Sequence, residues 1–173
     1  MTKRYWLILP LIVLAAGAVL GGCGGYTLDN SYRQGIRTVA VDMFGRGKDV
    51  YRREVETRAT EAIVKRIEQD TPYKVTVKSR ADTLLTGSIN SIEQRVLSFD
   101  SNTGDARELE LTLHVSYTWT DLRNGKVLAK AEKMSVSGTY VRESPLTEDF
   151  YQGSETVLNR LARRIVEGME AEW

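Results

Sequence analysis

Residues 108–120 alternate strictly between apolar and polar side chains, and this alternation limits the fold more than any other feature of the chain. The apolar positions are Leu109, Leu111, Leu113, Val115, Tyr117 and Trp119. Successive side chains of a β-strand point to opposite faces, so the pattern predicts one long strand with an apolar face and a polar face. Such a strand belongs in a sheet that is covered on one side and solvated on the other.

Neighbouring segments supply long partners for this strand. Asn124-Gly125 is a strong hairpin signal, and residues 126–140 are expected to return as an antiparallel strand. Residues 82–99 predict a further long strand. Its apolar positions change face after Ile89, which a β-bulge would produce.

Two amphipathic helices are expected, at residues 49–69 and 147–172. Asp49 and Thr147 are placed to cap their first turns, and Pro72 disfavours helix just beyond the first one. The apolar stripes consist of Val55, Ala59, Ala62, Ile63 and Ile67 in the first helix and of Val157, Leu158, Leu161, Ile165 and Met169 in the second.

The order of these elements predicts the fold class. Short strands at residues 36–43 and 73–77 join the long ones, so the order is strand, helix, several strands, helix. This order favours an α+β two-layer sandwich, in which two amphipathic helices pack on one face of a mostly antiparallel sheet of about four strands. The length suits a single domain, which we place at residues 35–173.

The amino-terminal segment has the features of an export signal. Two basic residues precede an apolar stretch at residues 5–20, which is shorter than the about 20 residues that a membrane-spanning helix needs. The sequence at its end, Leu20-Gly21-Gly22-Cys23, is similar to the signal of bacterial lipoproteins. We therefore expect a signal peptide at residues 1–22 and a lipidated tether at 23–34. The alternative is an ordinary secretory signal with a cysteine near its end.

Cys23 is the only cysteine of the chain, so no intrachain disulfide is possible. As the first residue of a mature lipoprotein it is expected to carry acyl chains such as palmitate, and each buried methylene contributes about 0.8 kcal/mol to membrane attachment. In the enteric lipoproteins that this segment resembles, Asp after the cysteine favours retention in the inner membrane. Gly24 stands there instead, which points to the outer membrane.

The composition argues against several other functions. The formal net charge is +1 and becomes −1 when Lys3 and Arg4 leave with the signal, so bulk charge does not favour nucleic-acid binding. No Gly-rich phosphate loop is present. His114 is the only histidine, and it lies on the polar face of the predicted strand. We therefore expect no catalytic residues, no enzyme activity, no metal, and no cofactor beyond the covalent lipid on Cys23.

Basic residues are the remaining candidates for ligand binding. Arg123 and Lys126 flank the hairpin turn, where exposed cations can contact phosphate groups. Arg160, Arg163 and Arg164 lie off the apolar stripe of the second helix and suit anionic lipid headgroups in the same way. The alternative for both sets, which we favour, is an ordinary solvated surface.

Six segments, taken in order, resemble the LptE family of outer-membrane lipoproteins, which takes part in lipopolysaccharide assembly. They are CGGYTL at 23–28, GIRTVAV at 35–41, TPYKV at 71–75, ADTLLTGSI at 81–89, DLRNGKVL at 121–128 and LARRIV at 161–166. The resemblance implies a domain of two helices on a small sheet. It also implies a plug and assembly partner of the LptD β-barrel in lipopolysaccharide transport to the cell surface, anchored in the outer membrane and facing the periplasm or the barrel lumen.

Two other functions are considered beside this one. A stand-alone envelope lipoprotein that binds a lipid or small ligand would need a closed apolar pocket between the sheet and the helices. A lipid-anchored hydrolase would need an acid, a base or a nucleophile that converge in a cleft, and the residue inventory supplies little for one.

Replacing Cys23 by serine should prevent acylation, because the hydroxyl does not substitute for the acyl-accepting thiol. We expect the C23S chain to keep its signal peptide and to lose its lipid-dependent attachment to the outer membrane. Mass spectrometry of the purified chain and its distribution between membrane fractions measure both effects. A C23S chain that is processed and membrane-held like the parent would contradict the lipoprotein assignment.

Overall fold

Strand β5 (Ala106–Asp121) is the central long strand of the sheet in the computed structural model, which describes residues 32–141 and 148–170. It pairs antiparallel with β4 (Thr83–Phe99) on one side and with β6 (Val127–Val141) on the other. From 109 to 119 every second side chain is buried and those between are partly exposed, so the predicted one-sided strand is confirmed.

The sheet is larger than expected and partly parallel. Within the described residues it has six strands in the order β3-β1-β4-β5-β6, with β2 beside β4. Strand β1 (Thr38–Val41) runs parallel to both β3 (Lys74–Val75) and β4, and β2 (Gly45–Arg46) is also parallel to β4. The expectation of about four mostly antiparallel strands is therefore wrong in strand number and in the direction of the added pairs. The physical reason is that a helix between two strands of one sheet returns the chain to the same end, which makes those strands parallel.

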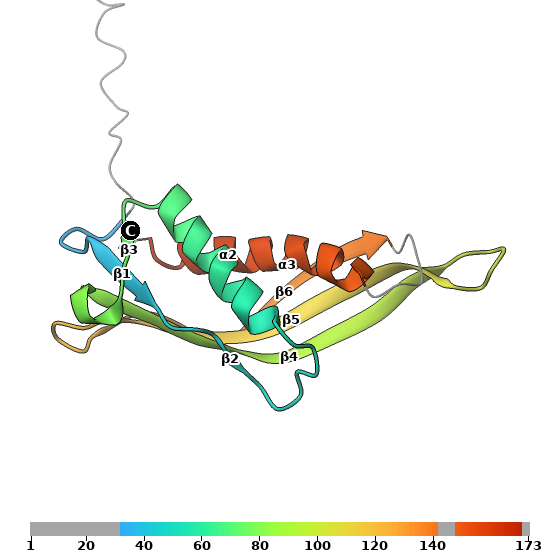
Figure 1. Ribbon diagram of the computed structural model, residues 1–173, viewed down its shortest axis with the longest axis horizontal. Coiled ribbons are helices and arrows are strands. Elements are labelled where there is room, and N and C mark those ends of the chain that lie inside the picture. The colour runs from blue at the N-terminus through green and yellow to red at the C-terminus, as the bar shows by residue number, and fades with distance from the viewer. Residues whose placement is uncertain (1–31, 142–147, 171–173) are drawn as a thin grey trace, which may run out of the picture. The chain divides into compact units, whose positions relative to one another are not determined.

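The two expected helices are present and cover the same face of the sheet (Figure 1). They are α2 (Val55–Asp70) and α3 (Glu148–Glu167), and a short 3-10 turn, η1 (Lys78–Arg80), precedes β4. The side chains that fill the space between the layers include Trp119, Tyr73, Phe44, Ile63, Ile67, Leu85, Leu111, Leu113, Leu161 and Ile165, all fully buried. The α+β class with both helices on one face is confirmed.

The helix ends differ from the expected ones. Helix α2 begins at Val55 rather than near Asp49, because the preceding segment is held by other contacts. Gly47 donates its N–H to the carbonyl of Ile89, and the side chain of Val50 is buried in the core. Helix α3 ends at Glu167, short of residue 172.

Two local features of the long strands are confirmed. The β4–β5 register shifts between Ile89 and Ser91, where the change of face predicted a bulge. Gly125 in the β5–β6 turn has φ +72°, a conformation that glycine adopts without steric cost. The predicted signal peptide at residues 1–22, Cys23, most of the tether and Thr147 lie outside the described residues.

Gly87 of β4 allows a close contact between the sheet and the segment after β1. The ring of Phe44 lies directly over it: a Cβ at this position would meet Phe44 Cε1 at 2.4 Å and the backbone oxygen of Ser116 at 2.9 Å. Real carbon atoms do not approach so closely, so either the buried ring or the strand would have to move. Any larger residue here should therefore loosen the core beneath α2.

Gly87→Ala should lower the free energy of unfolding by about 1–3 kcal/mol, which is the usual cost of overpacking a core. Urea denaturation of the two chains measures this difference. Gly45→Ala is the matched control, because its Cβ would meet nothing nearer than Ser88 Cβ at 3.4 Å. We expect the control to stay within about 0.5 kcal/mol of the parent. Equal stabilities for the two variants would show that the Phe44 contact does not constrain residue 87.

Candidate functional site

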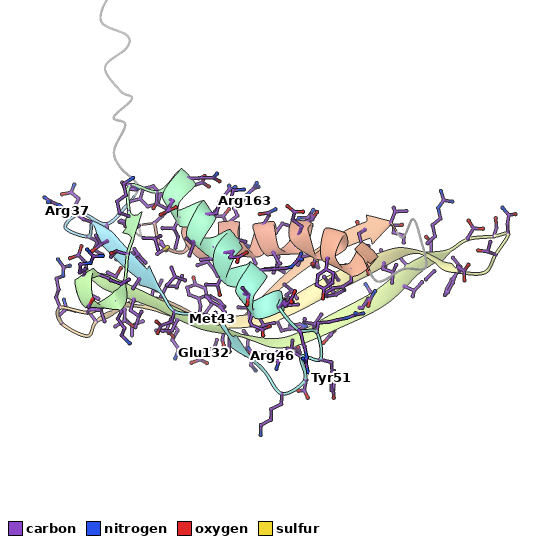
Figure 2. All side chains as sticks on the ribbon, viewed as in Figure 1. Arg37, Met43, Arg46, Tyr51, Glu132 and Arg163 are labelled. Atoms are coloured by element: carbon purple, nitrogen blue, oxygen red, sulfur yellow. The ribbon has the colours of Figure 1, made fainter. Side chains whose placement is uncertain are left out.

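The face of the sheet opposite the helices is polar along β5. On β5 its residues are Glu110, Thr112, His114, Ser116, Thr118 and Thr120, all of them partly exposed. Figure 2 shows Glu132 of β6 on this side of the sheet, whereas Arg163 lies with α3 on the other side. The polar second face that the alternation predicts is therefore present, and it spans three strands.

A concavity of about 480 Å³ lies on this face where β4, β5 and β6 meet. The hydroxyl oxygens of Ser88 and Ser116 are 3.1 Å apart, and Ser88 also donates to Oδ1 of Asn90 at 2.8 Å. At the other side of the concavity Lys130 Nζ lies 2.6 Å from Glu132 Oε1. The concavity is thus rich in hydroxyl and charged groups that already have hydrogen-bond partners within the sheet.

His114 lies between a hydroxyl and an acid on the same face. Its Nδ1 is 2.9 Å from Oγ of Ser135, and its Nε2 is 3.2 Å from Oε1 of Glu93. In a serine hydrolase the acid of such a row is buried, so that it holds the imidazole in one orientation. The Glu93 side chain is 72% exposed, and water competes for its hydrogen bond. The arrangement therefore suits cross-strand pairing between β4, β5 and β6 better than catalysis.

Within residues 32–141 and 148–170, no group of three or more His, Cys, Asp and Glu side chains is placed to hold a metal ion. In the same part of the chain no helix combines the length and the apolar character of a membrane span.

The two candidate ligand residues of the β5–β6 turn have different surroundings. Arg123 donates from Nε and Nη2 to the carboxylate of Asp121, at 3.0 and 2.8 Å, and from Nη1 to the carbonyl of Gly35 at 2.9 Å. The guanidinium therefore clasps the turn to the segment before β1. Lys126 is exposed, and its side chain has no ion pair with another described residue.

The partner of Arg123 is the buried Asp121, which was not among the predicted binding residues. Only 5% of the Asp121 side chain is exposed. Hydrogen bonds from Arg123 hold the pKa of Asp121 down to about 2, and the carboxylate in turn raises the pKa of Arg123. The sequence does contain a signal for the burial of Asp121. The alternation that starts at Leu109 places every second residue on the inward face, and Asp121 is the last residue of that series.

The three arginines of α3 lie together, as their spacing suggested. Arg160, Arg163 and Arg164 line a groove with residues 135–137 of β6. Nothing in the sequence pattern indicated that this part of β6 faces them, because the edge position of β6 is decided by the order of strands in the sheet.

Comparison with known proteins places this fold in a family. The model of the LptE family, described as lipopolysaccharide-assembly, matches residues 36–171. No curated protein matches the chain in sequence.

Solved structures share the fold at low sequence identity. Uncharacterized lipoprotein B from Nitrosomonas europaea is 16% identical with a TM-score of 0.52, and the match covers 82% of this chain and 88% of that one. PelC from Paraburkholderia phytofirmans is 15% identical with a TM-score of 0.52, covering 81% and 93%. CT253 from Chlamydia trachomatis is 12% identical with a TM-score of 0.51, covering 76% and 94%. At these identities the likeness is one of fold alone.

The ion pair between Asp121 and Arg123 should make the free energy of unfolding depend on pH below about pH 4. The pKa of Asp121 is lowered from 3.8 to about 2, so its contribution is complete above about pH 4 and is lost as the pH falls toward 2. Asp121→Asn should therefore flatten the decline of the urea midpoint over this range. The pKa values of Asp82, Asp100 and Glu132 are also lowered, so part of the decline should persist. Identical pH profiles for parent and D121N would argue against this ion pair.

Proposed function

The chain belongs to the LptE family of lipopolysaccharide-assembly proteins, and from that premise we propose that it is the plug and assembly partner of an LptD-type β-barrel in lipopolysaccharide transport to the cell surface. In this role it is a non-enzymatic lipoprotein. It is held in the outer membrane by acyl chains on Cys23, and it faces the periplasm or the barrel lumen.

The polar face of β4, β5 and β6 is the observation that carries this proposal. The lumen of a large outer-membrane barrel is polar, so its occupant must present polar groups to the wall. Every outward side chain of β5 from Glu110 to Thr120 meets that requirement. Enclosing polar groups costs least when they already have partners, as the Ser88–Ser116 pair and the His114–Ser135 pair do.

The alternative of a stand-alone lipoprotein with an apolar ligand pocket receives less support. It needs a closed cavity between the sheet and the helices, but side chains such as Trp119, Ile63 and Leu161 fill that layer and are fully buried. The concavity at Ser88 and Ser116 lies on the opposite, solvated face.

Contact with lipopolysaccharide at the β5–β6 turn belongs to the same proposal. Lys126 is exposed and has no ion pair among the described residues, so it is the better placed of the two candidates to meet a phosphate group. Arg123 is bound to Asp121 and Gly35, so it would act on such a ligand mainly by fixing the turn that carries Lys126.

Bulky substitutions on the polar face should weaken the barrel complex without unfolding the chain. Ser116→Trp in the concavity should lower recovery of the β-barrel roughly tenfold in affinity isolation from detergent-solubilised outer membrane, which corresponds to about 1.4 kcal/mol. The exposed Lys65 of α2 provides the control, as Lys65→Trp adds the same bulk on the helical layer. Urea denaturation must show both variants to be folded.

Affinity isolation of the unsubstituted parent chain is the decisive measurement. We expect it to bring down a large β-barrel protein that migrates as one complex with it. Isolation of the lipidated parent as a free monomer, under conditions that preserve other outer-membrane complexes, would refute the plug assignment.

A further inference from the structure

A basic groove of about 470 Å³ lies between helix α3 and strand β6. Its helical wall carries Arg160, Arg163 and Arg164, with Glu167 at one end, and its other wall is residues 135–137 of β6. We call it the basic edge groove. Its helical wall lies on the side of the sheet opposite the polar face, and its strand wall shares Ser135 with that face.

The positive charge of this groove is not neutralised within the described part of the chain. Arg163 and Arg164 are exposed, and neither forms a salt bridge with a described residue. Arg160 uses Nη1 to donate to the carbonyl of Ser137 at 2.7 Å. Three guanidinium groups against the single carboxylate of Glu167 give a surface that is complementary to an anionic ligand.

The other wall is an open strand edge. Strand β6 ends the strand order of the sheet, and β5 is its one partner strand among the residues that the structure describes. Arg160 reaches the carbonyl of Ser137 from the helical layer, so this carbonyl points away from β5. In an antiparallel pair the N–H and C=O of one residue point to the same side, and the side alternates along the strand. The backbone groups of Ser135, Ser137 and Thr139 therefore point outward.

We propose that the basic edge groove binds an extended acidic segment of a partner protein, which pairs with β6 as an added strand and places carboxylates on Arg163 and Arg164. Addition of a strand to an exposed sheet edge takes its affinity from main-chain hydrogen bonds and its specificity from alternate side chains. Acidic side chains at every second position of such a strand share one face of it, and this face can be turned toward the arginines of α3.

The lining of the groove favours a polypeptide over a phosphorylated lipid. Val136 is the one apolar side chain among the described residues that line it, and it is only 6% exposed, so acyl chains would find little surface there. The exposed apolar side chains of the long strands do not line the groove: Leu97 and Phe99 of β4 are 44% and 65% exposed, and Val141 of β6 is 57% exposed. A lipid would leave the outward backbone groups of β6 unused, whereas an added strand pairs with them.

Binding of a model acidic strand tests the proposal. The probe is a fluorescein-labelled decapeptide of alternating Glu and Thr, titrated with the lipidated full chain in detergent and followed by fluorescence anisotropy. Arg163→Gln with Arg164→Gln should weaken binding roughly tenfold, since two partly exposed ion pairs are lost. The matched control, Arg53→Gln with Lys65→Gln, removes two exposed charges elsewhere and should bind as the parent does.

A second pair of measurements examines strand pairing itself. The same peptide with every second backbone nitrogen methylated should lose binding at least tenfold, because it offers no N–H to one edge. Hydrogen exchange at the amides of Ser135, Ser137 and Thr139 should slow when the unmodified peptide is bound.

Three results would overturn the proposal. The first is equal binding of a peptide with Gln in place of Glu, and the second is equal binding of the methylated peptide. The third is full displacement of the peptide by glucosamine phosphate, with no slowing of hydrogen exchange at the β6 amides while glucosamine phosphate is bound. That result would assign the groove to a phosphate-bearing ligand. None of these results depends on the barrel complex, whose test uses the polar face.

Discussion

Burial of one face of β5 is the constraint on which the rest of this structure depends. The inward side chains from Leu111 to Trp119 lie beneath both helices and between the two flanking long strands. Because the side-chain period of a strand is two, a shift of one residue in register would expose this whole set and bury the polar one. A single alternating segment thus determines how β4 and β6 pair with β5, where α3 packs, and why the open face is polar.

The elements with strong local signals could be predicted from the sequence, and those decided by tertiary pairing could not. The alternation after Glu108, the turn at Gly125 and the bulge after Ile89 are periodic or stereochemical features that a few neighbouring residues determine. Strands β2 and β3 have two residues each, too few to show a period, and they exist because β4 and β1 offer open edges to them. Helix α2 starts six residues later than Asp49 predicts, because Val50 is committed to the core.

The candidate site shows the same division. The sequence places Arg123 at an exposed turn, which is correct, but it does not reveal that Asp121 and Gly35 occupy the guanidinium. That contact joins residues 88 positions apart, and only the pairing of β1 with β4 brings them together. Lys126 in the same turn has no such partner among the described residues. Two basic residues that look alike in the sequence therefore differ in what they can offer a ligand.

The arginines of α3 differ from Arg123 in the same way. A guanidinium bound to a buried carboxylate gains little from a second anion, since its best donors are already engaged. Arg163 and Arg164 have no acidic partner among the described residues, and they flank a strand whose outward N–H and C=O groups lack a neighbouring strand. An open edge promotes unwanted pairing unless it is covered, and Arg160 covers one carbonyl of it. An acidic strand would form hydrogen bonds with the outward backbone groups of β6 and ion pairs with Arg163 and Arg164. It would thereby prevent unwanted pairing at this edge, which is why we propose it as the occupant of the groove.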